Sequence, residues 1–244
     1  MPSRVFIAPY KMASESAKAL AQRMNVKRVA LNKTFKRSDV IINWGRSGVA
    51  VGTQRVLNPI TAVERAAGKL TTFRQLAATN VNTVPFTTNK QLAKQWLDSG
   101  EIVIARLFTN SSKGRGIKVL GRGEWVDAPL YTLYIQAEEY RVHVVGGKVI
   151  DLQKKKCKTD VEAHPFIKNL DNGWAFCKTN TTAPLNVYTT ATQAVENLGL
   201  DFGAVDMLCK EGQAYVLEVN TAPGIAETTL DNYARALEEL CVTK

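Results

Sequence analysis

The feature that most constrains the fold is a predicted β-hairpin near the end of the sequence. Two apolar and β-branched runs, 202–208 and 214–219, flank the sequence Lys-Glu-Gly-Gln at 210–213, which is typical of a turn. Each run contains one carboxylate, Asp206 in the first and Glu218 in the second. A charged side chain is unfavourable in a buried strand, so the presence of these two carboxylates needs a chemical explanation.

Strand geometry gathers oxygen ligands on one face of this hairpin. Side chains alternate along a strand, so Glu218 and Asn220 point the same way, and pairing about the turn puts Asp206 roughly opposite Glu218. Two carboxylates this close repel each other, and a divalent cation removes the repulsion; ligands of oxygen alone suit Mg²⁺ or Mn²⁺. The alternative is that Asp206 pairs with a nearby lysine and Glu218 lies at the rim of the sheet.

Composition bounds the class of protein and its partners. The chain has 244 residues, 45% of them hydrophobic and 22% charged, as in a globular protein of one domain or two small interwoven ones. It shows neither an apolar run of roughly 20 residues nor the apolar core of a signal peptide, so we expect no membrane association. Four widely spaced cysteines favour a reducing cytoplasm over a zinc site or a disulfide frame. The net charge of +10 favours polyanionic partners, whether nucleotide phosphates, nucleic acid or an acidic peptide.

The pattern of predicted elements changes along the chain. Residues 1–100 alternate short buried strands with helices, the last of them capped by Asn89 and stopped by Gly100. The remainder is rich in predicted strands, with a strong hairpin signal at Gly146-Gly147 and a less regular stretch over 160–185. We therefore predict an α/β architecture up to residue 100 and an α+β architecture beyond it.

A polar loop, "TNSSKGRG" at 109–116, lies between two of these strands. Its backbone N–H groups could fold over phosphate oxygens while Lys113 and Arg115 supply positive charge. The loop is not a P-loop, and no G-x-G-x-x-G follows a strand in this sequence. An ordinary polar turn is the alternative.

The order of these parts is similar to that of the ATP-grasp ligases. A cation ends a strand at Arg106, the polar loop follows, then a strand at 131–135 and a carboxylate at Glu139, and the carboxylate hairpin comes last. The stretch "DFGAVDMLCKEGQAYVLEVNTAPGI" resembles the C-terminal strands of the ribosomal-protein glutamate ligase and D-alanine ligase branches. The stretch "EYRVHVVGGKVIDLQKK" also resembles small ATP-grasp proteins encoded by tailed phages.

This resemblance implies an ATP-grasp fold with a nucleotide between two β-rich subdomains. It divides the chain into a short N-terminal α/β domain, 1–58, and an ATP-grasp domain, 59–244, with subdomains at about 59–130 and 131–244. It also implies a cytoplasmic protein, in the host cytoplasm if a phage encodes it.

The resemblance further implies the roles of individual residues. Asp206, Glu218 and Asn220 would hold the Mg²⁺ or Mn²⁺ ions that bridge the ATP phosphates. The expected ATP-binding set comprises phosphate-binding cations, a closing loop, backbone groups for adenine and a carboxylate for the ribose: Lys69, Arg106, Ser111, Ser112, Lys113, Tyr134, Ile135, Glu139 and Lys155.

Two basic residues are the candidates for catalysis. Ala204 stands where D-alanine ligases carry an arginine, so we do not expect D-alanine ligation, and Arg141 is expected to orient the acyl phosphate or the acceptor; a surface ion pair is the alternative. Lys154 or Lys155 would reach the phosphates, while alternation sends the other to solvent, and Lys154 is the catalytic candidate. His143 shares the face of Arg141, where a structural role is the ordinary interpretation.

The activity implied by the resemblance is ATP-dependent ligation of a carboxylate to an amine, through an acyl phosphate, with release of ADP and phosphate. The sequence does not identify the two substrates. Its charge is compatible with an acidic peptide or protein tail, or with a nucleic acid that carries a modified base. Two alternatives remain: a degenerate ATP-grasp module that binds nucleic acid or a partner protein, and an ATP-dependent kinase of a small molecule.

Overall fold

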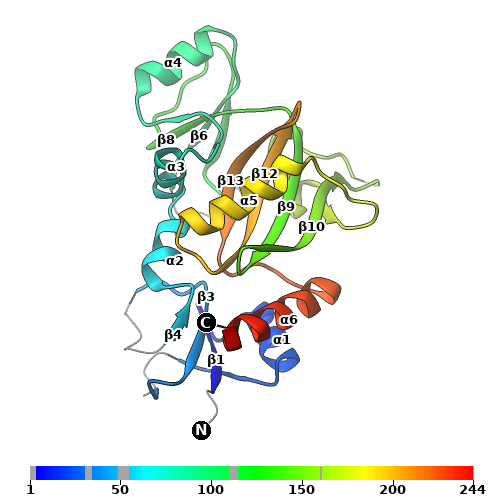
Figure 1. The fold of residues 1–244 in the computed structure, drawn as a ribbon. Helices are drawn as coiled ribbons and strands as arrows, with labels where there is room; N and C mark the ends of the chain where they lie inside the picture. Colours follow the sequence, from blue (N-terminus) through cyan, green and yellow to red (C-terminus); the bar gives the residue numbers. More distant parts are fainter. Residues whose placement is uncertain (1–3, 31–34, 49–54, 110–114, 160, 244) are drawn as a thin grey trace.

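The computed structural model describes residues 4–30, 35–48, 55–109, 115–159 and 161–243. Within these ranges the chain forms three β-sheets with α-helices packed on their faces (Figure 1). No helix in this part of the chain is both long enough and apolar enough to cross a membrane.

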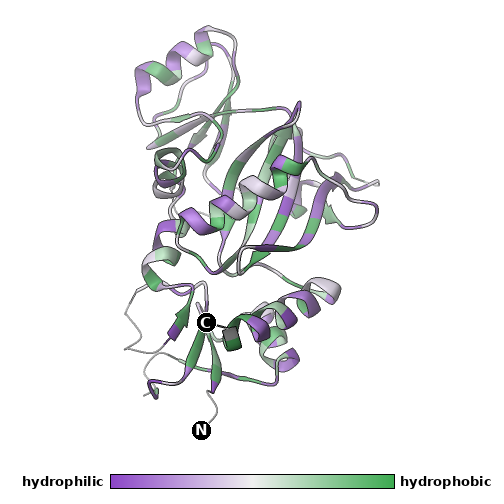
Figure 2. Ribbon diagram, viewed as in Figure 1, coloured by the Kyte–Doolittle hydropathy of each residue, from purple (hydrophilic) through white to green (hydrophobic). Residues whose placement is uncertain are grey.

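The N-terminal sheet is parallel, in the order β2-β1-β3-β4. Its strands are β1 (Val5–Pro9), β2 (Lys27–Arg28), β3 (Val40–Trp44) and β4 (Arg55–Leu57). Strands β1 and β3 are almost wholly hydrophobic, as the green ribbon in Figure 2 shows, because both faces of the sheet are covered. Helices α1 (Glu15–Arg23) and α6 (Glu227–Thr243) lie together in Figure 1 and share an apolar cluster with one of these faces.

The largest sheet is antiparallel, in the order β11-β10-β9-β12-β13. Its strands are β9 (Glu138–Val145), β10 (Lys148–Cys157), β11 (Trp174–Cys177), β12 (Phe202–Lys210) and β13 (Gln213–Asn220). Helix α5 (Leu185–Asn197) packs on one face through a cluster that includes Val142, Val187 and Val205. Because strand side chains alternate, Glu139 and Arg141 face the opposite side, away from α5. The predicted hairpin at Gly146-Gly147 is confirmed, and both glycines have positive φ.

The third sheet is antiparallel, in the order β5-β8-β6-β7, with helix α4 (Lys90–Asp98) against it. Its strands are β5 (Phe86–Thr87), β6 (Val103–Arg106), β7 (Ile117–Leu120) and β8 (Leu130–Leu133). Helices α2 (Ile60–Ala67) and α3 (Lys69–Ala78) connect the N-terminal sheet to this one, and a short 3₁₀ helix, η1 (Leu170–Asn172), precedes β11. Asn89 caps α4 as predicted, since its side chain accepts from two backbone N–H groups.

The subdomain limits differ from our predictions at two places. Strand β8 begins at Leu130, so a boundary at that residue falls inside the third sheet. Helix α6, which we assigned to the subdomain 131–244, contacts β9 and β10 of the largest sheet but also packs with α1 against the N-terminal sheet, and its Tyr233 and Leu237 are fully buried. The apolar stripe of α6 needs a partner, and one face of the parallel sheet supplies it.

The carboxylate hairpin contains a β-bulge that the sequence did not predict. From the turn, Met207 pairs with Val216, and the register then shifts so that Asp206 pairs with Glu218. The extra residue is Leu217, and it lines the same cavity as Glu218. The predicted pairing of Asp206 with Glu218 is therefore confirmed, and it depends on the bulge, because an unbroken register would put Leu217 opposite Asp206.

Candidate active site

A cavity of about 750 Å³ opens between the largest sheet and the third sheet. Strands β6, β7 and β8 line one side, and the face of β9, β10, β12 and β13 that is opposite α5 lines the other. Two connecting segments, 166–170 and 222–224, complete the wall. The volume is within the range of cavities that hold a nucleotide-sized ligand, roughly 300–1,000 Å³.

The three predicted metal ligands lie together in this cavity. Asp206, Glu218 and Asn220 all line it, and the Asn220 amide donates to Glu218 Oε1 at 3.2 Å. Lys69, at the start of α3, forms an ion pair with Glu218. Burial would raise the pKa of Glu218, but the adjacent ammonium of Lys69 and the hydrogen bonds outweigh it and hold the pKa at about 2. Glu218 is therefore an anion at neutral pH.

Arg141 makes a bidentate ion pair with Asp206. Its Nε and Nη2 donate to the two carboxylate oxygens at 2.6 and 2.8 Å, and its guanidinium lies over the Phe176 ring at 4.2 Å. Burial would lower the pKa of Arg141, but Asp206 outweighs it and raises the pKa. The alternative of a surface ion pair for Arg141 is wrong, because Asp206 is only 6% exposed and lies in the cavity. The alternative that Asp206 pairs with a lysine while Glu218 lies at the rim of the sheet is wrong, because the partner of Asp206 is Arg141 and Glu218 lines the cavity.

The structure separates the two lysines of β10. Lys155 lines the cavity, where it pairs with Glu139 and donates to the Lys168 carbonyl at 2.8 Å. Lys154 projects from the other face of the strand and pairs with Glu138 outside the cavity. The catalytic assignment of Lys154 is therefore wrong, for the reason that side chains alternate along β10. Burial raises the pKa of Glu139, although Lys155 opposes the shift.

Arg106 ends β6 with its guanidinium in the cavity. Its Nε is buried and has no hydrogen-bond partner among the residues that the structure describes. Burial lowers the pKa of Arg106, and the nearby Glu218 opposes the shift. A buried guanidinium N–H without an acceptor is costly, so this side of the cavity is suited to an anion.

The remaining predicted nucleotide contacts divide into two groups. Tyr134 and Ile135, which follow β8, line the cavity, and the N–H of Tyr134 donates to the Ile102 carbonyl at 2.9 Å. Ser111, Ser112 and Lys113 lie outside the described residues.

His143 lies on the predicted face but not in the cavity. It is fully buried, and its Nδ1 is 3.1 Å from the hydroxyl of Tyr233 on α6. The structural interpretation of His143 is therefore correct. Burial lowers its pKa to about 4, and the nearby Arg141 adds to the shift.

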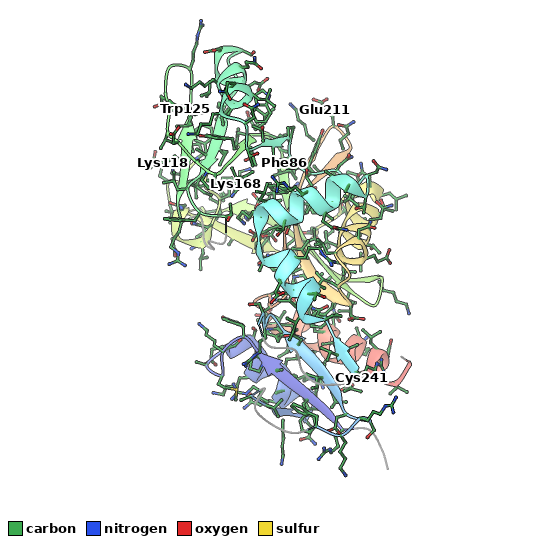
Figure 3. The ribbon with its side chains drawn as sticks, turned by 90° about the vertical axis from the view of Figure 1, so that its left-hand side faces the viewer. Phe86, Lys118, Trp125, Lys168, Glu211 and Cys241 are labelled. Atoms are coloured by element: carbon green, nitrogen blue, oxygen red, sulfur yellow. The ribbon has the colours of Figure 1, made fainter. Side chains whose placement is uncertain are left out.

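Sequence reasoning missed one wall of the cavity, the segment 166–176. This wall consists of Phe166, Ile167, Lys168, Asn169, Leu170, Trp174, Ala175 and Phe176. Lys168, labelled in Figure 3, lies between the third sheet and the largest sheet, with its ammonium 5.0 Å from the Trp174 ring centroid. The sequence does show a cluster of aromatic residues in this otherwise irregular stretch. Because the cluster has no helix or strand periodicity, the sequence does not predict where these side chains lie in the fold.

The two antiparallel sheets that enclose this cavity and the parallel N-terminal sheet together form the ATP-grasp fold. A crystal structure of D-alanine–D-alanine ligase from Bacillus anthracis superposes with a TM-score of 0.67 at 14% identity, covering 98% of this chain and 93% of that one. The ATP-grasp ligase PsnB, solved with a phosphomimetic variant of its minimal precursor, Mg and ADP, gives a TM-score of 0.72 at 9% identity over 99% of both chains. The resemblance to ATP-grasp ligases is thus confirmed for the fold, together with the α/β and α+β class.

Comparison by sequence gives one curated relative. A probable alpha-L-glutamate ligase of Serratia proteamaculans (strain 568) is 32% identical over 112 residues. The match covers 44% of this chain and 35% of that protein, so it spans about a third of the relative's length. No model of a protein family matches the sequence.

Proposed function

We propose that this protein is an ATP-dependent carboxylate–amine ligase that forms an amide bond through an acyl phosphate. The observation that carries the proposal is the cavity itself, in which two carboxylates and an amide from the hairpin meet five basic side chains from other parts of the chain. Those basic side chains are Lys69, Arg106, Arg141, Lys155 and Lys168. The ATP-grasp fold and the glutamate ligase relative support the same activity.

The cavity suits the triphosphate of ATP. The partnerless Nε of Arg106 and the ammonium of Lys69 would bind phosphate oxygens. Glu139 would accept from the ribose hydroxyls. Since the N–H of Tyr134 is already donated to Ile102, Tyr134 would contact adenine through its carbonyl oxygen, beside the backbone of Ile135.

The oxygen ligands of the hairpin fit Mg²⁺. In the described part of the chain, no group of three or more His, Cys, Asp or Glu residues could hold a metal unaided. Mg²⁺ is commonly held by one or two carboxylates together with substrate phosphates, which is the set that Asp206, Glu218, Asn220 and a bound ATP would provide. When bound, the ion would neutralise charge on the phosphates and so lower the cost of phosphoryl transfer.

The reaction would proceed in two displacements. A carboxylate oxygen of the first substrate attacks the γ-phosphorus of ATP, the bond to the β-phosphate oxygen breaks, and ADP leaves. The amine of the second substrate then attacks the acyl carbon, phosphate leaves, and the amine loses a proton. Arg141, in the cavity beside Asp206, would stabilise the negative charge that develops on the acyl oxygen.

Replacing Glu218 by glutamine tests this proposal. Glu218→Gln keeps the shape of the side chain but removes the charge that would hold the metal, so Mg²⁺-dependent ADP release should fall by about a hundredfold or more, on the scale of losing one preorganised group. The assay follows ADP release with ATP, Mg²⁺ and a pool of candidate carboxylates and amines, and mass spectrometry identifies the product.

Glu138→Gln is the matched control, because Glu138 also pairs with a lysine but lies outside the cavity. It should turn over ATP at the wild-type rate. Equal rates in Glu218→Gln and wild type would refute the assignment of the hairpin. A phosphorylated product without an amide would identify a kinase, and Mg²⁺-dependent nucleotide binding without turnover would identify a binding module.

A further inference from the structure

The net positive charge of this protein is concentrated in its N-terminal residues. Residues 1–58 contain 11 of the 32 lysines and arginines but only two of the 22 acids, Glu15 and Asp39. Residues 59–244 are nearly balanced, with 21 basic and 20 acidic residues. The surface of a soluble protein ordinarily mixes the two signs, so a segment almost without acids suggests a polyanionic partner.

The structure makes this imbalance larger at the surface. Asp39 is 1% exposed and is neutralised by Arg4, whose guanidinium donates to both of its carboxylate oxygens at 2.9 and 2.6 Å. Glu15 is therefore the only acid that residues 4–30, 35–48 and 55–58 expose. Five exposed cations of the same ranges have no ion pair with any described residue: Lys11, Lys18, Lys27, Lys36 and Arg37. We call these five residues the basic surface.

We infer that the basic surface binds the phosphate backbone of a nucleic acid. Four of its five members are lysines, a residue type that is depleted at protein–protein interfaces but common in contacts to phosphate. Tyr10 is 49% exposed, and the Lys11 ammonium lies 5.3 Å from its ring centroid. An exposed ring beside a cation is the kind of group on which an unpaired base stacks.

One member of the basic surface, Lys11, lies near a residue that lines the cavity. The N–H of Tyr10, next to Lys11, donates to the Trp44 carbonyl at 2.9 Å. The next residue, Gly45, is so close to Ala222 that an added Cβ would lie 2.6 Å from the Ala222 side chain, and Ala222 lines the cavity. At the foot of Figure 3, side chains that end in nitrogen surround this N-terminal sheet. A nucleic-acid strand that contacts Lys11 would therefore lie near the candidate active site.

Variants in which lysines of the basic surface are replaced by an uncharged residue test the inference. Lys18, Lys27 and Lys36 are replaced together by glutamine, and binding of a mixed-sequence DNA or RNA of about 30 nucleotides, single-stranded and duplex, is measured by fluorescence anisotropy across a range of salt concentrations. Each lost phosphate contact reduces the slope of log K against log salt by about 0.7–0.9, so the triple variant should lose about 2–3 in slope and at least tenfold in affinity.

The matched control is the triple variant Lys118→Gln, Lys148→Gln and Lys210→Gln, which removes the same charge from exposed positions on the other two sheets. It should keep the wild-type slope and affinity. Equal losses in the two triple variants would refute the basic surface as the binding site. Absence of nucleic-acid binding at low salt would also refute it, and binding of polyglutamate through the same lysines would then identify an acidic polypeptide as the partner. The measurement needs no ATP, so a chain that binds nucleic acid but ligates nothing would refute the proposed ligase and leave this inference intact.

Discussion

At the residue scale, every carboxylate proposed for the site already has a cation. Asp206 pairs with Arg141 and Glu218 with Lys69, and both ion pairs are partly buried. A buried charge is tolerated only with a partner, so the cations that would bind phosphate also balance the charge of these carboxylates. Removing one partner alone leaves an unpaired charge, and for that reason a neutral isostere such as Glu218→Gln is a cleaner probe than a truncation.

His143 should make stability depend on pH. Because burial lowers its pKa from the ordinary 6.5 to about 4, His143 stays neutral in the folded chain while it takes up a proton in the unfolded chain below pH 6.5. The free energy of unfolding should therefore fall as the pH drops from 6.5 to 4, and the contribution of His143 to this fall should total about 3 kcal/mol. Above pH 7 the contribution of His143 should be constant.

Urea unfolding at pH 7.5 and pH 4.5 in wild type and His143→Gln measures this contribution. Glutamine can still bond the Tyr233 hydroxyl but does not titrate, so the variant should lose less stability on acidification than wild type. The same loss in both proteins would show that other groups cause the acid sensitivity. The charged groups that act on His143 are Arg141 and Lys178, which lower its pKa, and Asp151, which raises it, and all three remain in the variant.

At the element scale, the turn of the carboxylate hairpin carries a removable strain. Glu211 and Gly212 have φ of +50° and +80°, as a type I′ turn requires, and Glu211 is exposed at the tip of the hairpin in Figure 3. Asparagine adopts positive φ at lower cost than glutamate. Glu211→Asn should therefore raise the free energy of unfolding by about 0.5–1 kcal/mol.

The control for this change is Lys210→Asn, one residue earlier, where the backbone is a regular strand and asparagine is unfavourable. It should be neutral or destabilising in the same urea unfolding experiment. A gain from both substitutions, or from neither, would contradict the strain at Glu211.

This hairpin also shows how far a sequence can be read. Alternation and turn chemistry predicted both strands, the turn and the shared face of Glu218 and Asn220, because all of these depend on near neighbours. The bulge at Leu217 and the ion pairs of Arg141 and Lys69 could not be predicted, since they depend on side chains brought together from distant parts of the chain. The wall at 166–176 was missed for the same reason: its backbone is irregular, and only the assembled fold gives its aromatic residues a place.

At the scale of the whole molecule, packing contacts connect the N-terminal sheet to the segment that forms one wall of the cavity. Helix α6 begins a few residues after β13 and packs against the N-terminal sheet. In the same apolar cluster, the ring of Trp44 stacks on that of Phe202 of β12, with 5.4 Å between the ring centroids. The predicted domain 1–58 therefore shares its core with the end of the chain. Residues 222–224, between β13 and α6, form part of the cavity wall. A change at this junction should therefore alter the cavity wall.

Gly45→Ala tests this junction. Gly45 has φ of +76°, and an added Cβ would lie 2.6 Å from the Ala222 Cβ, a clash that only backbone movement relieves. Gly100 has a similar φ of +86° but no atom within 4 Å of an added Cβ, so Gly100→Ala carries the conformational strain alone, about 1–2 kcal/mol. In urea unfolding, Gly45→Ala should lose at least about 1 kcal/mol more than Gly100→Ala, because overpacking adds to the strain. Equal losses would mean that the segment carrying Ala222 moves aside freely, and that the N-terminal sheet and the cavity wall are not rigidly coupled.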